Sequence, residues 1–167
     1  AWVDDNKLWA RRPSEEATVI CPTTDIPLRG KHNEGNAAAA VAAAIAFGAP
    51  TTDFADAIRS FKGLPHRIEY ITEYKGITYY NDSLATTVDA AVAAINSFDE
   101  PLLLIAGGAS KGADFSALGT CIAASSVRAV LLIGDEAVRI EAAIRQVGAQ
   151  TAVRHCRDLR EATTIAR

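Results

Sequence analysis

The stretch YYNDSLATT, residues 79–87, decides how the rest of the chain is interpreted, because a strand runs through a polar turn directly into an alanine-rich helix. Residues 81–87 carry a carboxylate, an amide and three hydroxyls. A helix N-terminus favours anions, and ligands of open α/β sheets bind outside the carboxyl ends of the strands. The stretch therefore predicts a site for phosphate or carboxylate chemistry. The structural alternative is a capped helix start, with Thr86 or Thr87 as N-cap.

Composition limits the class of protein. The 167 residues are 49% apolar and 22% charged, which fits one globular domain or one domain plus a piece of another. The net charge of -3 predicts neither a nucleic-acid partner nor binding to an anionic membrane. The longest apolar run, 37–47, is too short to span a bilayer. Because the chain starts at Ala1 and contains no methionine, we expect a fragment of a longer, cytoplasmic protein.

Cysteine and histidine spacing gives no sign of a metal site. The three cysteines are far apart, odd in number and without CxxC spacing, which favours reduced thiols: Cys21, Cys121 and Cys156. The three histidines also lack metal-ligand spacing: His32, His66 and His155. The sequence therefore predicts no structural metal.

Four elements are expected before the break at Gly63-Leu64-Pro65-His66. They are strands at 7–11 and 17–21 and helices at 34–47 and 53–61. The first helix is nearly all alanine, which predicts that it is buried rather than amphipathic. Thr51 or Thr52 is the expected cap of the second helix, with Phe54, Ala57, Ile58 and Phe61 on one face.

The remaining pattern predicts an α/β domain. Strands at 67–74 and 77–80 flank a two-residue hairpin turn, Lys75-Gly76. Helices at 88–97, 115–124 and 136–147 then alternate with strands at 101–106, 127–133 and 151–153. Uninterrupted apolar strands separated by helices indicate a Rossmann-like, mostly parallel sheet covered on both faces, with the antiparallel hairpin at its entrance. The break makes 1–62 and 63–167 the expected domains.

Three further clusters could bind ligands. The loop GGASKGAD, 107–114, follows a buried strand but lacks both the GxGxxG and the GxxxxGK[ST] spacing, so it is either a binding loop or only a flexible one. Arg67 places a permanent cation at the start of a strand, suited to phosphate or carboxylate, or is simply solvated. His32, Asn33 and Asn36 put two amides one turn apart, to read a base edge or to cap a helix.

Together, these clusters resemble a known family. The order HNxxN at 32–36, GLPHR at 63–67, NDSxAT at 81–86 and GGxxKxxDF at 107–115 resembles the Mur ligases, from about residue 5 to the end of the chain. Members of that family have a UDP-sugar domain, a central ATPase domain and a Rossmann-like C-terminal domain. The resemblance implies that 1–62 is the tail of the ATPase domain and 63–167 is a truncated C-terminal domain.

The resemblance also implies a function. The motifs are most similar to the branch that adds D-glutamate to UDP-N-acetylmuramoyl-L-alanine through an acyl phosphate in peptidoglycan synthesis. ATP and Mg²⁺ would be cofactors, with most metal and phosphate-loop ligands outside this chain. The chain alone is then expected to be inactive, and the whole enzyme to be a cytoplasmic monomer.

Matching positions carry the family's roles. The resemblance implies nucleotide contacts at these positions: His32, Asn33, Asn36, His66, Arg67 and Asp82. It implies glutamate contacts at Ser83, Thr86 and Lys111, and catalytic roles for Arg67, Asp82 and Lys111. An arginine would offset the charge that develops during phosphoryl transfer to a carboxylate.

One position departs from the family pattern. Many D-glutamate ligases have lysine where this chain has Leu84, which puts that contact in doubt. Sister ligases that add L-glutamate or extend folylpolyglutamate would share the fold and much of the nucleotide chemistry. A non-catalytic Rossmann-like nucleotide-binding module is the alternative from a different class.

Overall fold

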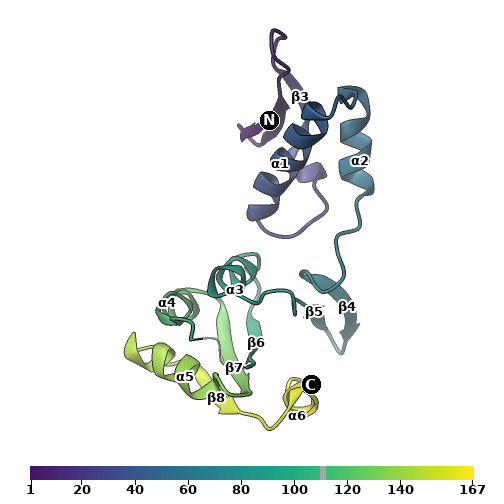
Figure 1. Cartoon of the computed structure of the whole chain (residues 1–167). Helices are drawn as coiled ribbons and strands as arrows, with labels where there is room; N and C mark the ends of the chain where they lie inside the picture. Colours follow the sequence, from purple (N-terminus) through teal and green to yellow (C-terminus); the bar gives the residue numbers. More distant parts are fainter. Residues whose placement is uncertain (110–111) are drawn as a thin grey trace. The chain divides into compact units, whose positions relative to one another are not determined.

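The chain folds as two compact units, Ala1–Leu64 and Pro65–Arg167. The structure is a computed structural model that describes residues 1–109 and 112–167 (Figure 1). The division lies inside the predicted 63–66 break, whereas the assignment of the first unit to an ATPase domain stays a prediction. Among the described residues, no helix combines the length and apolarity needed to cross a membrane.

The first unit packs two helices on a small antiparallel sheet. Its strands, in the order β1-β2-β3, are Trp2–Asp4, Lys7–Ala10 and Thr18–Pro22. Its helices are α1 (His32–Ala46) and α2 (Phe54–Ser60), preceded by 3-10 turns η1 (Thr23–Asp25) and η2 (Thr51–Asp53). The core consists of Leu8, Ala10, Cys21, Ala38, Val41 and Phe54. The turn at Asp5 and Asn6 adopts left-handed φ values of 47° and 54°, which these two residue types tolerate.

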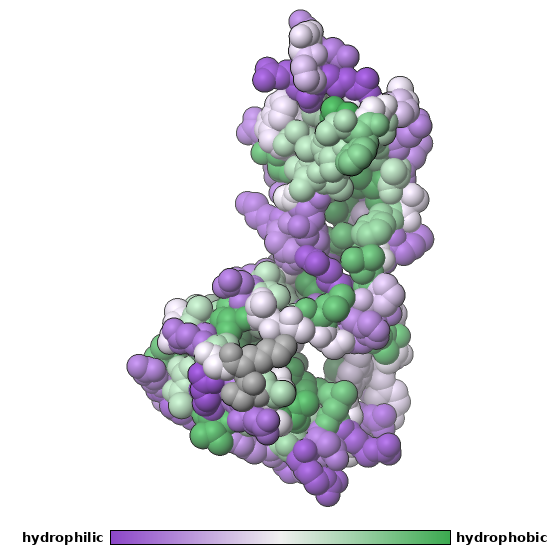
Figure 2. All heavy atoms as spheres, viewed as in Figure 1, coloured by the Kyte–Doolittle hydropathy of each residue, from purple (hydrophilic) through white to green (hydrophobic). Residues whose placement is uncertain are grey.

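The expectation that the alanine helix is buried was wrong. Within α1, only Asn33, Ala38 and Val41 are buried, so one stripe packs on β1 and β2. The alanines at 39, 40, 42, 43 and 46 are exposed, and Phe47 beyond the helix is 94% exposed. Figure 2 shows pale green alanine surface over α1. Alanine has a high helix propensity, so the helix forms without burial of its outer face.

The predicted threonine cap of α2 was also wrong. The turn η2 precedes the helix, Asp53 is the N-cap, and no side chain caps the helix. The Thr52 hydroxyl instead donates to the Asp53 carboxylate at 2.9 Å. Of the predicted apolar face, Phe54 is buried, Ala57 is exposed, and Phe61 lies beyond the end of α2 and is 45% exposed. The apolar stripe of α2 is therefore shorter than the sequence suggested.

The second unit has the predicted α/β fold. Strands β6 (Leu102–Gly107), β7 (Val127–Ile133) and β8 (Ala152–His155) form a parallel sheet in that order. Strands β4 (Glu69–Tyr74) and β5 (Ile77–Asn81) form the predicted antiparallel hairpin, as a two-stranded sheet of its own. The hairpin turn, Lys75-Gly76, has φ values of 53° and 78°.

Helices cover both faces of the parallel sheet, as predicted (Figure 1). The helices are α3 (Val88–Ile95), α4 (Ser116–Ala124), α5 (Ala137–Gln146) and α6 (Leu159–Ile165). Because side chains alternate along a strand, Val130 and Leu132 of β7 pack in the core formed with α3, α4 and α5. Leu131 faces the opposite way and packs in a smaller core with Ala162 of α6.

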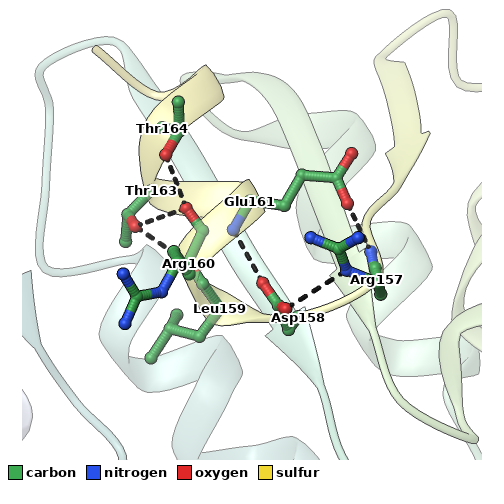
Figure 3. Close-up of polar contacts among 7 residues, drawn as sticks. All are labelled: Arg157, Asp158, Leu159, Arg160, Glu161, Thr163 and Thr164. Atoms are coloured by element: carbon green, nitrogen blue, oxygen red, sulfur yellow. Dashed lines mark hydrogen bonds and ion pairs between the residues drawn. The ribbon is translucent and has the colours of Figure 1, made fainter.

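Helix α6 was not predicted from the sequence, although its start is strongly capped (Figure 3). The Asp158 carboxylate accepts a hydrogen bond from the Glu161 backbone N–H at 2.8 Å. The Glu161 carboxylate in turn accepts from the Arg157 N–H at 2.9 Å, so the two acids satisfy donors at the helix entrance reciprocally. The helix is only seven residues long, which makes its apolar period hard to recognise.

The cap of α6 predicts a pH dependence of stability. The Glu161 backbone hydrogen bond, with Arg157 nearby, lowers the pKa of Asp158 below its ordinary value of 3.8. Stabilisation by this cap is therefore fully present above pH 3.8 and lost as pH falls through the lowered pKa. Asp158→Asn keeps a capping oxygen but cannot titrate, so its melting temperature should depend less on pH below 4 than that of the wild type.

Thermal melts by circular dichroism from pH 2 to 7 test this prediction. Asp158→Ala should melt lower than wild type at pH 7, and Asp99→Asn, on an exposed loop, should keep the wild-type pH dependence. Equal acid sensitivity of Asp158→Asn and wild type would contradict it.

The contact between α4 and α5 depends on Gly119. A Cβ at this position would lie 2.4 Å from the backbone oxygen of Ala143 in α5. Overpacking against backbone costs about 1–3 kcal/mol, so Gly119→Ala should lower the free energy of unfolding by about that amount. Gly35→Ala in α1 is the control, because nothing lies within 4 Å of its Cβ position, and it should stabilise by about 0.5–1 kcal/mol. Urea unfolding of both variants measures the difference, and equal shifts would show that the helices can separate.

Candidate functional site

Two turns of the second unit, 65–69 and 81–87, are fastened together at three points and are called the paired turns below. The Leu84 N–H donates to the His66 carbonyl at 3.0 Å. The Ile68 N–H donates to Asp82 Oδ1, also at 3.0 Å. Asn81 Nδ2 lies 2.8 Å from His66 Nδ1, which accepts when that nitrogen carries no proton. The motif around Arg67 and the motif around Asp82 therefore form one structure.

The first of the paired turns has an unusual backbone. His66 and Ile68 have φ values of 64° and 44°, and for a β-branched residue such as isoleucine this conformation is rare. Each such residue costs on the order of 1–3 kcal/mol, so surrounding contacts must hold it. The Glu69 carboxylate accepts the His66 N–H at 2.8 Å, and Asp82 accepts the Ile68 N–H. Strand β4 consequently begins at Glu69, and the predicted strand start at Arg67 was wrong.

Arg67 lies between the two left-handed residues. Its side chain is exposed, and within 1–109 and 112–167 its guanidinium makes no hydrogen bond or ion pair. An exposed guanidinium on a fixed backbone suits an anionic ligand, because its planar donors match phosphate or carboxylate oxygens. The paired turns thus hold Arg67 in place while leaving its charge available.

The second of the paired turns leads into α3. Thr87 caps the helix by accepting the Ala90 N–H at 3.2 Å, so Thr87 rather than Thr86 is the N-cap. Thr86 is exposed, and so is Ser83, whose N–H donates to Asn81 Oδ1 at 3.1 Å. The predicted substrate residues Ser83 and Thr86 are therefore accessible on the same turn as Asp82. Leu84, the residue that departs from the family's sequence pattern, is 54% exposed.

The glycine-rich loop follows β6. Gly107 has a φ of 136°, and a Cβ there would lie 1.8 Å from the Ile133 carbonyl oxygen, so only glycine fits beside β7. At the other end, Asp114 Oδ1 accepts from the N–H and the hydroxyl of Ser116 at 2.9 and 2.6 Å. These two hydrogen bonds lower the pKa of Asp114. Lys111 lies outside the described residues, so its predicted place beside Asp82 and Thr86 stays a prediction.

The HNxxN motif lies in the first unit. Asn33 is buried, its Nδ2 donates to the Arg29 carbonyl at 2.6 Å, and its Oδ1 accepts from Asn36 Nδ2 at 2.9 Å. Because α1 already begins at His32, neither asparagine caps it. Asn33 fixes the preceding loop and orients Asn36, which is exposed and better placed to meet a ligand.

The described residues contain neither a cluster of possible metal ligands nor a disulfide. No cluster there of three or more His, Cys, Asp or Glu side chains could hold a metal ion. All three cysteines are free, with Cys21 and Cys156 buried. Burial raises the pKa of the Cys21 and Cys121 thiols, which disfavours the reactive thiolate.

The profile of a family described as Mur ligase, glutamate ligase domain, matches residues 66–167. This chain belongs to the Mur ligase family. The match begins at His66, in the first of the paired turns, and includes the glycine-rich loop. The family resemblance of the sequence motifs is therefore confirmed.

Curated relatives of this Mur ligase chain are named UDP-N-acetylmuramoylalanine--D-glutamate ligase. The protein from Roseiflexus sp. (strain RS-1) is 41% identical over 146 residues, covering 87% of this chain and 31% of the relative. The one from Symbiobacterium thermophilum is 38% identical over 164 residues, covering 98% of this chain and 35% of the relative. The chain thus spans about a third of the length of these relatives.

Solved structures of Mur ligases and related enzymes share the fold. MurF from Acinetobacter baumannii matches with a TM-score of 0.68 at 20% identity, covering 95% of this chain and 34% of that one. Mycobacterium tuberculosis folylpolyglutamate synthase complexed with ADP matches with a TM-score of 0.65 at 21% identity, covering 84% of this chain and 33% of that one. At such identities the likeness concerns the fold alone.

Two residues of the paired turns, Asn81 and Ile68, were not predicted from the sequence as site residues. Asn81 joins the two turns through His66, and Ile68 carries both the strained backbone and the N–H that reaches Asp82. Asn81 is the first residue of the NDSxAT motif, so the motif could have indicated it as a site residue. No sequence pattern marks Ile68, because its role lies in its backbone.

Proposed function

We propose that the protein containing this chain is an ATP-dependent ligase that adds D-glutamate to UDP-N-acetylmuramoyl-L-alanine through an acyl phosphate in peptidoglycan synthesis. The observation that carries the proposal is the paired turns, which join the turn that holds an exposed Arg67 to the turn that holds Asp82, Ser83 and Thr86. The names of relatives about 40% identical to this chain support this particular reaction. Residues 1–62 would then be the tail of a central ATPase domain, and 63–167 the glutamate ligase domain.

The residues present fit a nucleotide. In the second unit, taken by itself, Arg67 offers a permanent charge without a described partner, which suits phosphate oxygens. In the first unit, taken by itself, Asn36 offers an exposed amide, which suits a base edge. His32, His66 and Asp82 would complete the chain's share of the ATP contacts, whereas Asn33, predicted as a further contact, would act by orienting Asn36. Bound ATP supplies the phosphoryl group that activates the carboxylate, and Mg²⁺ would be held mostly by residues outside this chain. Arg67 would neutralise charge that develops on the transferred group.

Glutamate would bind near the second of the paired turns. An amino acid with two carboxylates needs a cation and hydroxyl donors, and the chain offers Lys111 with Ser83 and Thr86. Leu84 replaces the lysine of many D-glutamate ligases, so Lys111 would carry more of the charge recognition here. We also propose that the whole enzyme is a cytoplasmic monomer and that this chain alone is inactive.

A steady-state assay of phosphate release by the full-length protein tests the proposal. Release should require ATP, UDP-N-acetylmuramoyl-L-alanine and D-glutamate together, and should stay at background when any one is omitted. L-glutamate should support a much lower rate. Release that prefers L-glutamate would instead assign the protein to a sister ligase.

Two alternatives remain testable in parallel. The fold shared with folylpolyglutamate synthase favours a trial with a folate acceptor and L-glutamate, where turnover would contradict the proposal. A non-catalytic nucleotide module would bind ATP by itself. Calorimetry of the 167-residue chain should show no micromolar ATP affinity, because the phosphate loop and metal ligands would lie elsewhere.

A further inference from the structure

An ion pair of the second unit lies next to the glycine-rich loop and belongs to none of the family motifs. Arg139 Nη1 lies 2.9 and 2.8 Å from the two carboxylate oxygens of Glu136, one turn earlier at the start of α5. The Glu136 side chain is only 5% exposed, whereas that of Arg139 is 47% exposed. A carboxylate this buried needs a close partner, so the pair has a fixed geometry.

The ion pair contacts the first flank of the loop, residues 107–109, through the backbone of Glu136. The Glu136 N–H donates to the Gly108 carbonyl at 3.2 Å, and the Gly108 N–H donates to the Ile133 carbonyl at 3.1 Å. A Cβ at Gly134 would lie 2.9 Å from the Gly108 oxygen, so the two backbones pass in close contact. The turn between β7 and α5 therefore holds the loop where it leaves β6.

The ion pair contacts the second flank of the loop, residues 112–114, through the Arg139 side chain. Arg139 Nη2 donates to the Ala113 carbonyl, and the guanidinium lies 5.4 Å from the centroid of the Phe115 ring. Asp114, between these two residues, is held separately by Ser116. One guanidinium thus joins the buried Glu136 carboxylate, a loop carbonyl and an aromatic ring at the start of α4.

We infer that Glu136 and Arg139 are positioning residues that set the separation of the two loop flanks, 107–109 and 112–114. Lys111, the lysine proposed to bind glutamate, lies between these flanks in the sequence and outside the described residues. The inference rests on the proposed function for its link to glutamate, but the contacts of the flanks stand independently of it. A misplacement of about 1 Å can cost up to about a hundredfold in rate, which makes such positioning consequential.

The Glu136–Arg139 ion pair and its contacts to both loop flanks are called the clamp below. Arg139→Gln and Arg139→Lys separate the contribution of the positive charge to this clamp from that of the planar guanidinium. Glutamine loses the charge that Glu136 needs, whereas lysine keeps the charge but lacks the planar fork that reaches Glu136 and Ala113 together. Arg145→Gln is the matched control on the same helix. Arg145 also pairs with an acid, Glu141, at 3.4 Å, also donates to a backbone carbonyl, and is also 47% exposed, but it lies at the other end of α5.

Two measurements on the full-length protein test the inference. Hydrogen exchange followed by mass spectrometry should show faster exchange in peptides covering 107–115 for Arg139→Gln than for Arg145→Gln. The KM for D-glutamate should rise about tenfold in Arg139→Gln, less in Arg139→Lys, and not in Arg145→Gln, while the KM for ATP changes less than twofold.

Unchanged exchange of the loop in Arg139→Gln would overturn the clamp itself. Faster exchange with an unchanged KM for D-glutamate would overturn its link to the substrate. A wild-type protein without D-glutamate ligase activity would refute the proposed function, and the exchange measurement would still decide whether the clamp exists.

Discussion

Arg67→Ala in the full-length enzyme is expected to lower kcat/KM for ATP on the order of a hundredfold to a thousandfold, without a loss of stability. Removing one preorganised donor from a site where charge develops typically has an effect of this size. The Arg67 guanidinium makes no hydrogen bond or ion pair to another described residue, so nothing in that part of the fold loses a partner when it is removed. The defect should therefore appear in turnover rather than in folding.

Arg67→Lys and Arg154→Ala are the informative companions. Lysine retains the charge but not the planar fork, so Arg67→Lys should recover part of the lost rate. Arg154 is an exposed arginine on β8, and its removal should leave kcat/KM near the wild-type value. The comparison requires steady-state kinetics with ATP as the varied substrate and thermal melts of all three variants. If Arg67→Ala is as active as Arg154→Ala, Arg67 does not serve the nucleotide.

Asp82→Ala should also lower kcat/KM on the order of a hundredfold, but partly for a structural reason. Its Oδ1 accepts the Ile68 N–H at 3.0 Å and helps to hold a turn with two left-handed residues. Removing the acceptor leaves a backbone donor unsatisfied and the strained turn less restrained, which costs roughly 1–3 kcal/mol of stability. Arg67 lies inside that turn, so its position should become less defined.

Asp82→Asn separates the two roles of the carboxylate. Asparagine keeps an oxygen that can accept the Ile68 N–H but carries no charge, so its melting temperature should stay near that of the wild type. Any remaining loss of activity would then measure the contribution of the charge. Hydrogen exchange at the Ile68 amide should accelerate in Asp82→Ala and not in Asp82→Asn. Equal exchange in the two variants would show that Asp82 does not hold the turn.

The sequence predicted those parts of the fold that depend on local pattern. The apolar run at 127–133 gave β7 with its exact bounds, and the Lys75-Gly76 turn gave the hairpin. Thr87 was one of two predicted caps and is the one observed. Such features follow from side-chain alternation and turn chemistry over a few neighbouring residues.

The features that define the site depend on contacts between distant residues. The hydrogen bond from Ile68 to Asp82 spans 14 residues, and the one from Arg139 to Ala113 spans 26. Neither leaves a periodic pattern in the sequence. Motif order indicated which side chains matter, but not that Asp82 supports the backbone around Arg67. The exposed outer face of α1 was missed because alanine is compatible with both burial and exposure.

Mass spectrometry of the reaction product identifies which amino acid the full-length enzyme adds, and how many copies of it. The full-length enzyme would receive ATP, UDP-N-acetylmuramoyl-L-alanine and equal amounts of D- and isotopically labelled L-glutamate. We expect one product, whose mass corresponds to the addition of a single unlabelled D-glutamate. Incorporation of labelled L-glutamate, addition of several glutamates, or no product would contradict it.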